Sequence, residues 1–361
     1  MKSKNVCFFN SNMAWGGGEK WHLTTCIEFK RRGYKTFLIT NTNSQIGVRG
    51  VQEEQDVHFC HIGNLSFINP VKIFRMVKFF RTHKIDAVVL NLPSDLKLGG
   101  IAAKLAGVKK IIYRRGTARP LRNTFLNRFL FTKVLTHVII ISKEVGRCFT
   151  RGNESWFPEE KMVLMYNAVD TSKPIDKSRK IYEKDEEELV IGSAGRLSEE
   201  KGHKYLIELA KILKTDGLRF KVLIAGTGKL RENLQKMIDD NGLGSEVKLL
   251  GHVDDMPAFL NSLDLFVFTS LYEGGASALI ETLQYGVPII AWNISSNPEI
   301  IEDGITGGLV EPFDVEKLSL KVKSMVTSKE DIEKIIDQGH AKVEKMFDFK
   351  RNLDLLEDIL S

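Results

Sequence analysis

The stretch VFTSLYEGGASALIETLQYGVPIIA, residues 267–291, decides the fold class of this chain. An apolar run ends near Ser270, and a short glycine-containing loop follows it. A helix then opens near Ser277, stops at Gly286 and gives way to a second apolar run. This order of strand, loop, helix and strand is typical of a parallel α/β sheet, where ligands bind at the carboxyl ends of strands and helix N-termini hold phosphate.

Two carboxylates, Glu273 and Glu281, lie in this stretch, one in the loop and one in the first turns of the helix. At that spacing they can face different parts of one elongated ligand. Because carboxylates accept hydrogen bonds from hydroxyls, the pair suits a sugar and a ribose on either side of a pyrophosphate. The alternative is a surface glutamate followed by one that merely stabilises the helix, and these residues alone leave it open.

Strand and helix signals alternate along the whole chain, which favours parallel sheets with helices on both faces. Predicted strands cover 6–10, 34–40, 85–91, 109–114, 137–142, 189–195, 220–226, 247–251, 265–270 and 287–292. Predicted helices between them include 19–32, 95–107, 121–135, 201–215, 229–241 and 255–262, with a last helical segment at 329–361. A polar, charged stretch interrupts the pattern. We therefore predict an α/β protein with a first domain at 1–170, a linker at 171–188, a second domain at 189–340 and a C-terminal helix at 341–361.

The E-x7-E spacing resembles the signature of retaining nucleotide-sugar glycosyltransferases of glycosyltransferase family 4. Further motifs of that family occur in the expected order: SNMAWGGGEKWHL (11–23), LMYNAVD (164–170), SAGRLSEEKGHKYLIELA (193–210), LIAGTGKL (223–230) and NPEIIEDGITGGLVEP (297–312). The resemblance implies the GT-B fold, in which two Rossmann-like, doubly wound domains face a central cleft. It also implies that the C-terminal helix crosses back to the first domain.

Arg196 and Lys201 flank the start of a predicted helix, where two cations and a helix N-terminus can together bind a diphosphate. The resemblance assigns catalysis to Arg196, Lys201 and Glu273. It assigns nucleotide-sugar binding to Gly17, Gly18, Gly226, Gly228, Val253, Gly274, Gly275, Ala276, Ser277 and Glu281. Candidates for the acceptor side are Glu19, Asp95, Arg114 and Arg115. For the cations, the alternative is an ordinary pair of surface side chains, and for Glu19 it is a helix N-terminal acid.

The chain departs from the family pattern at two positions. Where many relatives place a histidine near the reacting sugar, this chain has Arg114 and Arg115, which suit a phosphorylated acceptor, the donor or a purely structural role. Gly275 stands where many relatives have a bulky residue, so the family pattern does not indicate which sugar the donor carries. The adjacent pair Asp254 and Asp255 lacks the Asp-x-Asp spacing of metal-dependent transferases and is expected to open a helix. We predict no metal and no cofactor, the donor being a UDP-, GDP- or ADP-sugar.

Charge is distributed unevenly. Residues 1–170 carry 27 Lys and Arg against 12 Asp and Glu, a net charge of +15, whereas the remainder carries 25 against 34, a net of −9. Two segments of the basic half, 72–81 and 109–133, interleave Lys and Arg with Phe and Leu. This pattern suits an anionic membrane surface, or else a solvated basic face over a buried apolar one. No nucleic-acid motif is present, so nucleic acid is not an expected partner.

The N-terminus lacks a signal-peptide pattern, and no apolar stretch reaches the roughly 18 residues that a membrane span requires. The four cysteines have no paired or metal-ligand spacing, which indicates reduced thiols. We expect a cytoplasmic protein that associates peripherally with the inner face of the membrane. The predicted activity is retaining transfer of a hexose from a nucleotide-diphosphate sugar to a glycan or lipid-linked acceptor, in cell-surface polysaccharide or lipopolysaccharide synthesis. The alternatives are another GT-B-like enzyme, such as a sugar-nucleotide epimerase, and a non-catalytic nucleotide-sugar-binding protein.

Overall fold

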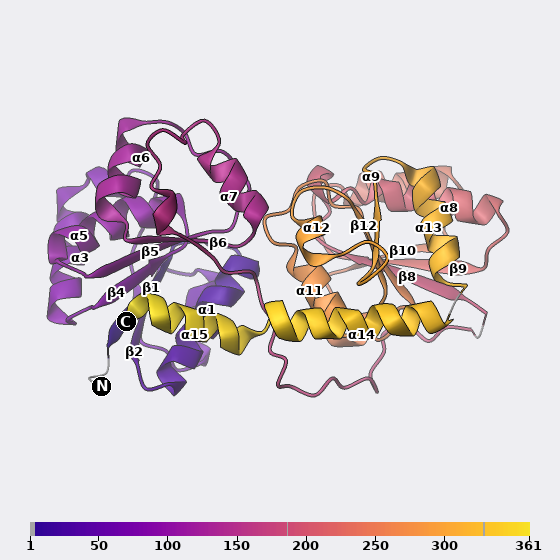
Figure 1. Ribbon diagram of the computed structural model, residues 1–361, viewed down its shortest axis with the longest axis horizontal. Coiled ribbons are helices and arrows are strands. Elements are labelled where there is room, and N and C mark those ends of the chain that lie inside the picture. Colours follow the sequence, from indigo (N-terminus) through magenta and orange to yellow (C-terminus); the bar gives the residue numbers. More distant parts are fainter. Residues whose placement is uncertain (1–3, 186, 328) are drawn as a thin grey trace. The chain divides into compact units, whose positions relative to one another are not determined.

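The computed structural model describes residues 4–185, 187–327 and 329–361. The chain divides into two compact units, each with its own parallel sheet (Figure 1). One unit comprises Met1–Tyr166 and Lys350–Ser361, and the other comprises Asn167–Phe349. The predicted linker 171–188 thus falls inside the second unit, and the chain returns to the first unit at Lys350. The prediction of two Rossmann-like, doubly wound α/β domains is confirmed.

The first unit is built on a seven-stranded parallel sheet with the order β3-β2-β1-β4-β5-β6-β7. Its strands are β1 (Asn5–Asn10), β2 (Lys35–Thr40), β3 (Val57–Phe59), β4 (Ala87–Leu90), β5 (Lys110–Arg115), β6 (His137–Ile140) and β7 (Met162–Leu164). The short strands β3 and β7 were not predicted from the sequence. The strand order reverses between β1 and β4, and in open α/β sheets such a reversal marks the place where ligands bind.

Helices cover both faces of this sheet, and for that reason its central strands are apolar on both sides. They are α1 (Gly17–Arg31), α2 (Gln45–Gln52), α3 (Pro70–Thr82), α4 (Pro93–Asp95), α5 (Ile101–Ala106), α6 (Phe125–Phe129) and α7 (Lys143–Thr150). The predicted helix 95–107 is interrupted by a π-helical stretch, η2 (Leu96–Gly100), and the predicted helix 121–135 ends in another, η3 (Leu130–Val134). Short helical turns also occur at η1 (Ser66–Ile68) and η4 (Glu159–Lys161).

The last helix, α15 (Phe349–Leu360), belongs to the first unit. Arg32, just after α1, pairs with Asp354 and Glu357 at 2.7 Å each. The predicted helical segment 329–361 is in fact two helices, because α14 (Lys329–Met346) ends before α15 begins. Between them the backbone bonds to Val169, which donates to the Phe347 carbonyl and accepts from the Phe349 amide, both at 2.9 Å. These two bonds replace the helical pattern and end α14.

The second unit has a six-stranded parallel sheet with the order β10-β9-β8-β11-β12-β13. Its strands are β8 (Leu189–Ala194), β9 (Phe220–Ala225), β10 (Val247–Gly251), β11 (Leu265–Phe268), β12 (Ile289–Trp292) and β13 (Gly308–Val310). Its helices are α8 (Lys204–Thr215), α9 (Arg231–Asp240), α10 (Met256–Leu260), α11 (Ser277–Gln284), α12 (Asn297–Ile300), α13 (Val315–Met325) and α14, with one short turn, η5 (Glu199–Lys201). Helices α8 and α13 pack together on one face of the sheet, and α11 and α14 pack together on the other (Figure 1). The strand order of this sheet reverses between β8 and β11.

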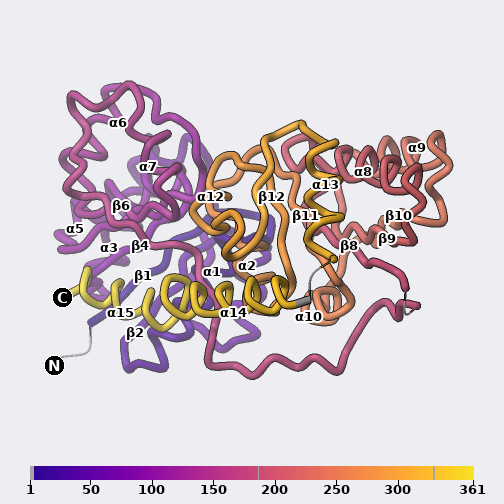
Figure 2. Tube along the Cα trace, turned by 45° about the vertical axis from the view of Figure 1, so that its right-hand side comes forward, coloured from indigo at the N-terminus to yellow at the C-terminus, as the bar shows by residue number. Residues whose placement is uncertain are grey.

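The segment that leads into β8 runs as an extended loop along the second unit (Figure 2). It is held there by side chains that flank α10, one just before the helix and one just after it. Arg179 pairs with Asp255 at 2.6 Å, and the Ile181 amide donates to the Ser262 hydroxyl at 2.9 Å. No helix within the described ranges is long and apolar enough to cross a bilayer.

Candidate active site

Two loops meet at the strand-order reversal of the second unit, one after β8 and one after β11. The β8 loop carries Lys201, and its neighbour Glu200 accepts two hydrogen bonds through its backbone carbonyl. The donors are the Leu271 amide at 2.8 Å and the Ser270 hydroxyl at 3.1 Å, both after β11. The two loops are therefore fixed to each other through their backbones.

Gly202 makes this close approach possible. Its φ of +63° lies in the left-handed region, and a Cβ atom there would stand 2.2 Å from the Thr269 carbonyl oxygen. The Thr269 hydroxyl also donates to the Gly202 carbonyl at 3.0 Å. Only glycine satisfies both the backbone conformation and the contact. The Lys-Gly pair in the sequence thus sets how near the cation comes to the β11 loop.

Lys201 and Glu273 form an ion pair, with 2.5 Å between Nζ and Oε1. Both side chains are largely buried, with exposed fractions of 23% and 11%. The Glu273 backbone is held by Ser295, whose hydroxyl accepts from its amide at 3.1 Å and donates to its carbonyl at 2.7 Å. Ser295 adopts a left-handed φ of +57°. Ser295 was not among the residues predicted from the sequence, since only its place just after a strand end distinguishes it from other loop serines.

Arg196 lies earlier on the β8 loop and is exposed. In the described part of the chain no carboxylate pairs with its guanidinium, so this cation faces solvent at the strand ends. Beneath the loop, burial lowers the pKa of His203 to about 4, and the charge of Lys201 acts in the same direction. The imidazole is therefore neutral near pH 7 and adds no charge to the site.

The structure explains why residues 226 and 228 are glycines, which the sequence did not reveal. A Cβ at Gly226 would lie 1.9 Å from the Gly195 carbonyl oxygen, and one at Gly228 would lie 2.3 Å from the Leu197 carbonyl oxygen. Backbone bonds connect the same segments, among them Leu197 amide to Thr227 carbonyl at 2.9 Å. Both glycines allow the β9 loop to pack directly on the loop that carries Arg196 and Lys201.

The next loop along the sheet carries Val253, which is half-buried. Gly251 precedes it with a φ of +77°, and its carbonyl accepts from the Gly226 amide at 2.7 Å. Asp255 accepts from the Ala258 amide at 3.0 Å and thereby caps α10, as the sequence predicted. The loops after β8, β9 and β10 are thus bonded in series.

The N-terminus of α11 follows Glu273 directly and is preceded by Gly274 and Gly275. Ala276 adopts a φ of +26°, which is unusual for a residue with a Cβ. Asn167 binds here, donating to the Ser277 hydroxyl at 2.8 Å and to the Gly275 carbonyl at 3.3 Å. The Asn-Ala-Val-Asp segment therefore fixes the start of α11.

Glu281 lies in the second turn of α11 and is partly exposed. Gln284, at the end of the same helix, donates to the Asp170 carbonyl at 2.8 Å. The helix is thus held at both ends by the segment 167–170.

The first unit brings Glu19 and Arg114 to its own strand-order reversal. Both side chains are buried, with exposed fractions of 4% and 3%. The side-chain amides of Asn10 and Asn91 donate to Glu19 Oε1 at 3.4 and 3.2 Å. Burial lowers the pKa of Arg114 to about 10, although the charge of Glu19 opposes that shift. Charged side chains are seldom buried, and buried charged groups with shifted pKa values often mark functional sites.

Gly17 and Gly18 form the first turn of α1, directly above this buried cluster. A Cβ at Gly18 would lie 3.3 Å from the Asn91 amide nitrogen and 3.8 Å from Arg114 Nη1. Glycine is therefore favoured here by side chains beneath the loop. The Glu19 carboxylate already lies at this helix N-terminus, which makes a hydroxyl-bearing ligand a better match than a second anion.

Asp95 and Arg115 have mainly internal partners. Asp95 is fully buried and accepts from the backbone amides of Ser11 and Leu92 at 3.2 and 2.8 Å, which ties the β1 loop to the β4 loop. Burial raises the pKa of Asp95 to about 7. Arg115 donates to the Arg119 carbonyl at 2.8 Å.

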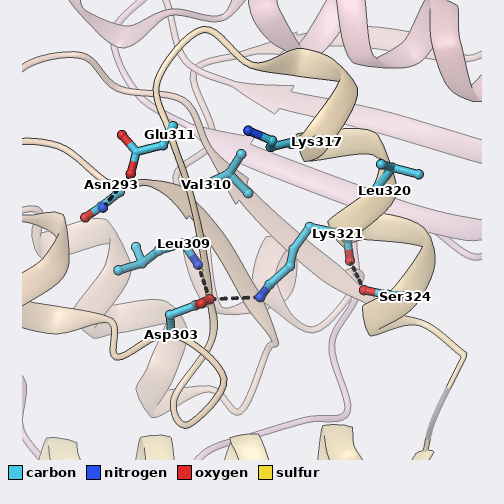
Figure 3. A pocket seen from close by; sticks show the side chains of 9 residues that line it. All are labelled: Asn293, Asp303, Leu309, Val310, Glu311, Lys317, Leu320, Lys321 and Ser324. Atoms are coloured by element: carbon cyan, nitrogen blue, oxygen red, sulfur yellow. Dashed lines mark hydrogen bonds and ion pairs between the residues drawn. The ribbon is translucent and has the colours of Figure 1, made fainter.

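A hollow of about 530 Å³ lies elsewhere on the second unit, along the edge strand β13 (Figure 3). The polar groups in it bind one another. Asp303 accepts from Lys321 at 2.9 Å and from the Leu309 amide at 2.8 Å, and Asn293 donates to Glu311 at 2.9 Å. The bond from the Leu309 amide gives one backbone group on the edge strand β13 a partner within the chain. The hollow is separate from the Lys201–Glu273 pair.

Comparison with known proteins agrees with this geometry. Residues 15–173 match the family model described as Glycosyltransferase Family 4, and residues 174–342 match the one described as Glycosyl transferases group 1. The two matches adjoin and together extend over most of the chain. The chain belongs to the nucleotide-sugar glycosyltransferases of the family 4 type.

Particular relatives agree with that assignment. The chain is 27% identical over 315 residues to an Escherichia coli UDP-Gal:alpha-D-GlcNAc-diphosphoundecaprenol alpha-1,3-galactosyltransferase, covering 82% of this chain and 80% of that protein. It is 32% identical over 167 residues to the amylovoran biosynthesis glycosyltransferase AmsK of Erwinia amylovora, covering 44% of this chain and only 41% of that protein. The Anabaena protein HepE, in a crystal structure with UDP and glucose, has the same fold, with a TM-score of 0.81, 19% identity and 99% of both chains covered.

Proposed function

We propose that this glycosyltransferase moves a hexose, with retention of anomeric configuration, from a nucleotide-diphosphate sugar to a glycan or lipid-linked acceptor in cell-surface polysaccharide or lipopolysaccharide synthesis. The observation that carries the proposal is the Lys201–Glu273 pair at the strand-order reversal, beside the N-terminus of α11. The names of the two relatives support it, one by its diphosphoundecaprenol acceptor and one by amylovoran biosynthesis. A UDP-sugar is the first donor to test, ahead of GDP- and ADP-sugars.

In the proposed reaction the bond between the anomeric carbon and the phosphate oxygen breaks while the acceptor oxygen bonds to the same face of that carbon. The acceptor proton passes to the leaving phosphate, so no nucleophilic side chain is needed. Arg196 and Lys201 offset the negative charge that grows on the leaving diphosphate, and such preorganised charges supply much of the rate enhancement in enzymes. No cofactor takes part in this scheme.

The two glutamates have separate roles in this scheme. Glu281, within α11, binds the ribose hydroxyls of the nucleotide, and Glu273 positions the hexose and supports its developing positive charge. Glu281→Gln should therefore weaken binding of the nucleotide diphosphate and of the donor alike. Glu273→Gln should lower turnover without weakening nucleotide binding. Isothermal titration calorimetry on both variants tests this division, and a covalent glycosyl adduct on either residue would contradict the mechanism.

The direct test is incubation with UDP-, GDP- and ADP-hexoses and undecaprenyl-diphosphate sugar acceptors, with the anomeric configuration of the product read by NMR. We expect a product with the donor's configuration and a loss of turnover on the order of a hundredfold for Arg196→Ala. A product of inverted configuration would refute the retaining mechanism. Epimerised nucleotide sugar would favour the epimerase alternative, and binding without transfer or hydrolysis would favour a non-catalytic binding protein.

We further propose that the first unit binds an anionic membrane surface at the inner face of the membrane. Two apolar side chains on its basic segments are unusually exposed, Phe125 on α6 at 88% and Phe74 on α3 at 67%. Lys72, Arg75 and Arg128 lie on the same two helices. Exposed aromatic groups among cations suit the interface of an anionic bilayer, where a lipid-linked acceptor would be found.

A further inference from the structure

The ammonium of Lys201 has a fixed carboxylate partner within the chain, Glu273. The backbones of both residues are held by hydrogen bonds. Lys201 lies on a turn that is closed by a hydrogen bond from its backbone amide to the Ser198 carbonyl at 3.0 Å. The backbone amide and carbonyl of Glu273 both bond to the Ser295 hydroxyl. Neither loop can move far from the other, so any ligand of Lys201 must lie close to the Glu273 carboxylate.

That arrangement has a consequence for a diphosphate. An anion bound by Lys201 is attracted by the ammonium and repelled by the carboxylate beside it, and in a largely buried site both effects are stronger than in water. The carboxylate also competes directly with the phosphate for the hydrogen bonds of the ammonium. An anion bound by Arg196 meets neither this repulsion nor this competition, since none of the described residues pairs a carboxylate with the Arg196 guanidinium.

We propose that Glu273 opposes binding of the nucleotide diphosphate at Lys201 and thereby speeds release of that product. The proposal rests on the proposed function and adds a second task for the same side chain. While the hexose is present, its hydroxyls occupy Glu273 and weaken the competition. Once the hexose has been transferred, the carboxylate is again available to Lys201, and the diphosphate leaves more readily. The charge of Glu273 is then a determinant of product inhibition as well as of sugar positioning.

The alternative is that Glu273 supports Lys201 in the position that binds the diphosphate. The two possibilities predict opposite signs for the same substitution. If Glu273 is a competitor, Glu273→Gln tightens the diphosphate, whereas if it is a support, Glu273→Gln weakens it. The substitution keeps the shape of the side chain and removes its charge.

The experiment is calorimetric titration of UDP, GDP and ADP into the full chain, followed by titration of the tightest binder into three variants. For Glu273→Gln we expect a dissociation constant lower by on the order of tenfold, from unit charges a few ångströms apart at intermediate dielectric. Glu273→Asp keeps the charge and should stay near the wild-type value. Glu199→Gln is the matched control, because it removes an exposed carboxylate two residues from Lys201 that forms no ion pair within the described part of the chain; it should change affinity less than twofold.

A second measurement is product inhibition. The same nucleotide diphosphate should inhibit slow donor hydrolysis by Glu273→Gln at lower concentration than it inhibits the wild type. Thermal melting of each variant confirms that it is folded. Unchanged or weaker binding by Glu273→Gln overturns the proposal, as does equal tightening by Glu199→Gln or Glu273→Asp. If no nucleotide diphosphate binds the wild type at millimolar concentration, the proposed function falls with it; if one binds and only the tightening is absent, the proposed function stands.

Discussion

Replacing Gly202 by alanine tests whether the close approach of the loops after β8 and β11 is needed for stability and for turnover. The new Cβ would meet the Thr269 carbonyl oxygen at 2.2 Å, in a backbone with a φ of +63°. The left-handed conformation alone costs alanine about 1 kcal/mol. The contact forces the turn to shift and breaks the bond from the Thr269 hydroxyl, which adds about 1 kcal/mol for the bond and a similar amount for strain. We expect Gly202→Ala to lower the free energy of unfolding by about 2–4 kcal/mol.

The chain provides a matched control in Gly217, which follows α8 with a φ of +74° and has no atom within 4 Å of the place that a Cβ would occupy. Gly217→Ala carries the conformational cost without the contact, so we expect a loss of about 1 kcal/mol. Urea denaturation of both variants isolates the contact energy. Turnover should fall by on the order of a hundredfold in Gly202→Ala, because Lys201 is displaced, and little in Gly217→Ala. Equal stability losses, or normal turnover by Gly202→Ala, would refute the reasoning.

Three further predictions concern the supporting residues and the first unit. Ser295→Ala removes both backbone bonds to the Glu273 loop and should lower stability by about 1–2 kcal/mol and reduce turnover but not nucleotide affinity. Ser296→Ala is its control, because that buried hydroxyl has no partner among the described residues, and wild-type behaviour by Ser295→Ala would refute the positioning role. Since burial raises the pKa of Asp95 to about 7, its protonated form favours the folded state; that stability is complete below about pH 4 and is lost as pH rises through 7. Urea titrations should show a decline of about 2–3 kcal/mol from pH 5 to 8 that Asp95→Asn lacks, and equal pH slopes would contradict it. Phe125→Ser should reduce the salt-sensitive co-sedimentation of the protein with anionic vesicles. The control Phe313→Ser, which changes an exposed phenylalanine of the second unit, should leave it unchanged. Equal binding of the wild type to neutral and anionic vesicles would argue against a membrane-binding surface.

The sequence was sufficient for the fold class, and the reason is local. Parallel strands buried on both faces must be apolar along their length, so the runs at 6–10 and 265–270 can be recognised without tertiary information. Short edge strands such as β3 and β13 give no such signal, because three residues are too few to show a pattern. The break between α14 and α15 was also missed, since it depends on backbone bonds to Val169, which is far away in the sequence.

For the candidate site, the sequence by itself determined which residue types stand after which strands: the cations at 196 and 201, the glutamates at 273 and 281, and the glycines between them. Only the tertiary structure decided which of these residues contact one another. It paired Lys201 with Glu273 and placed Ser295 on the Glu273 backbone. It also explained Gly226 and Gly228 by their contact with a neighbouring loop. The physical reason is that strand order, which no local pattern encodes, determines which loops become neighbours, and the charge and packing of each side chain depend on those neighbours.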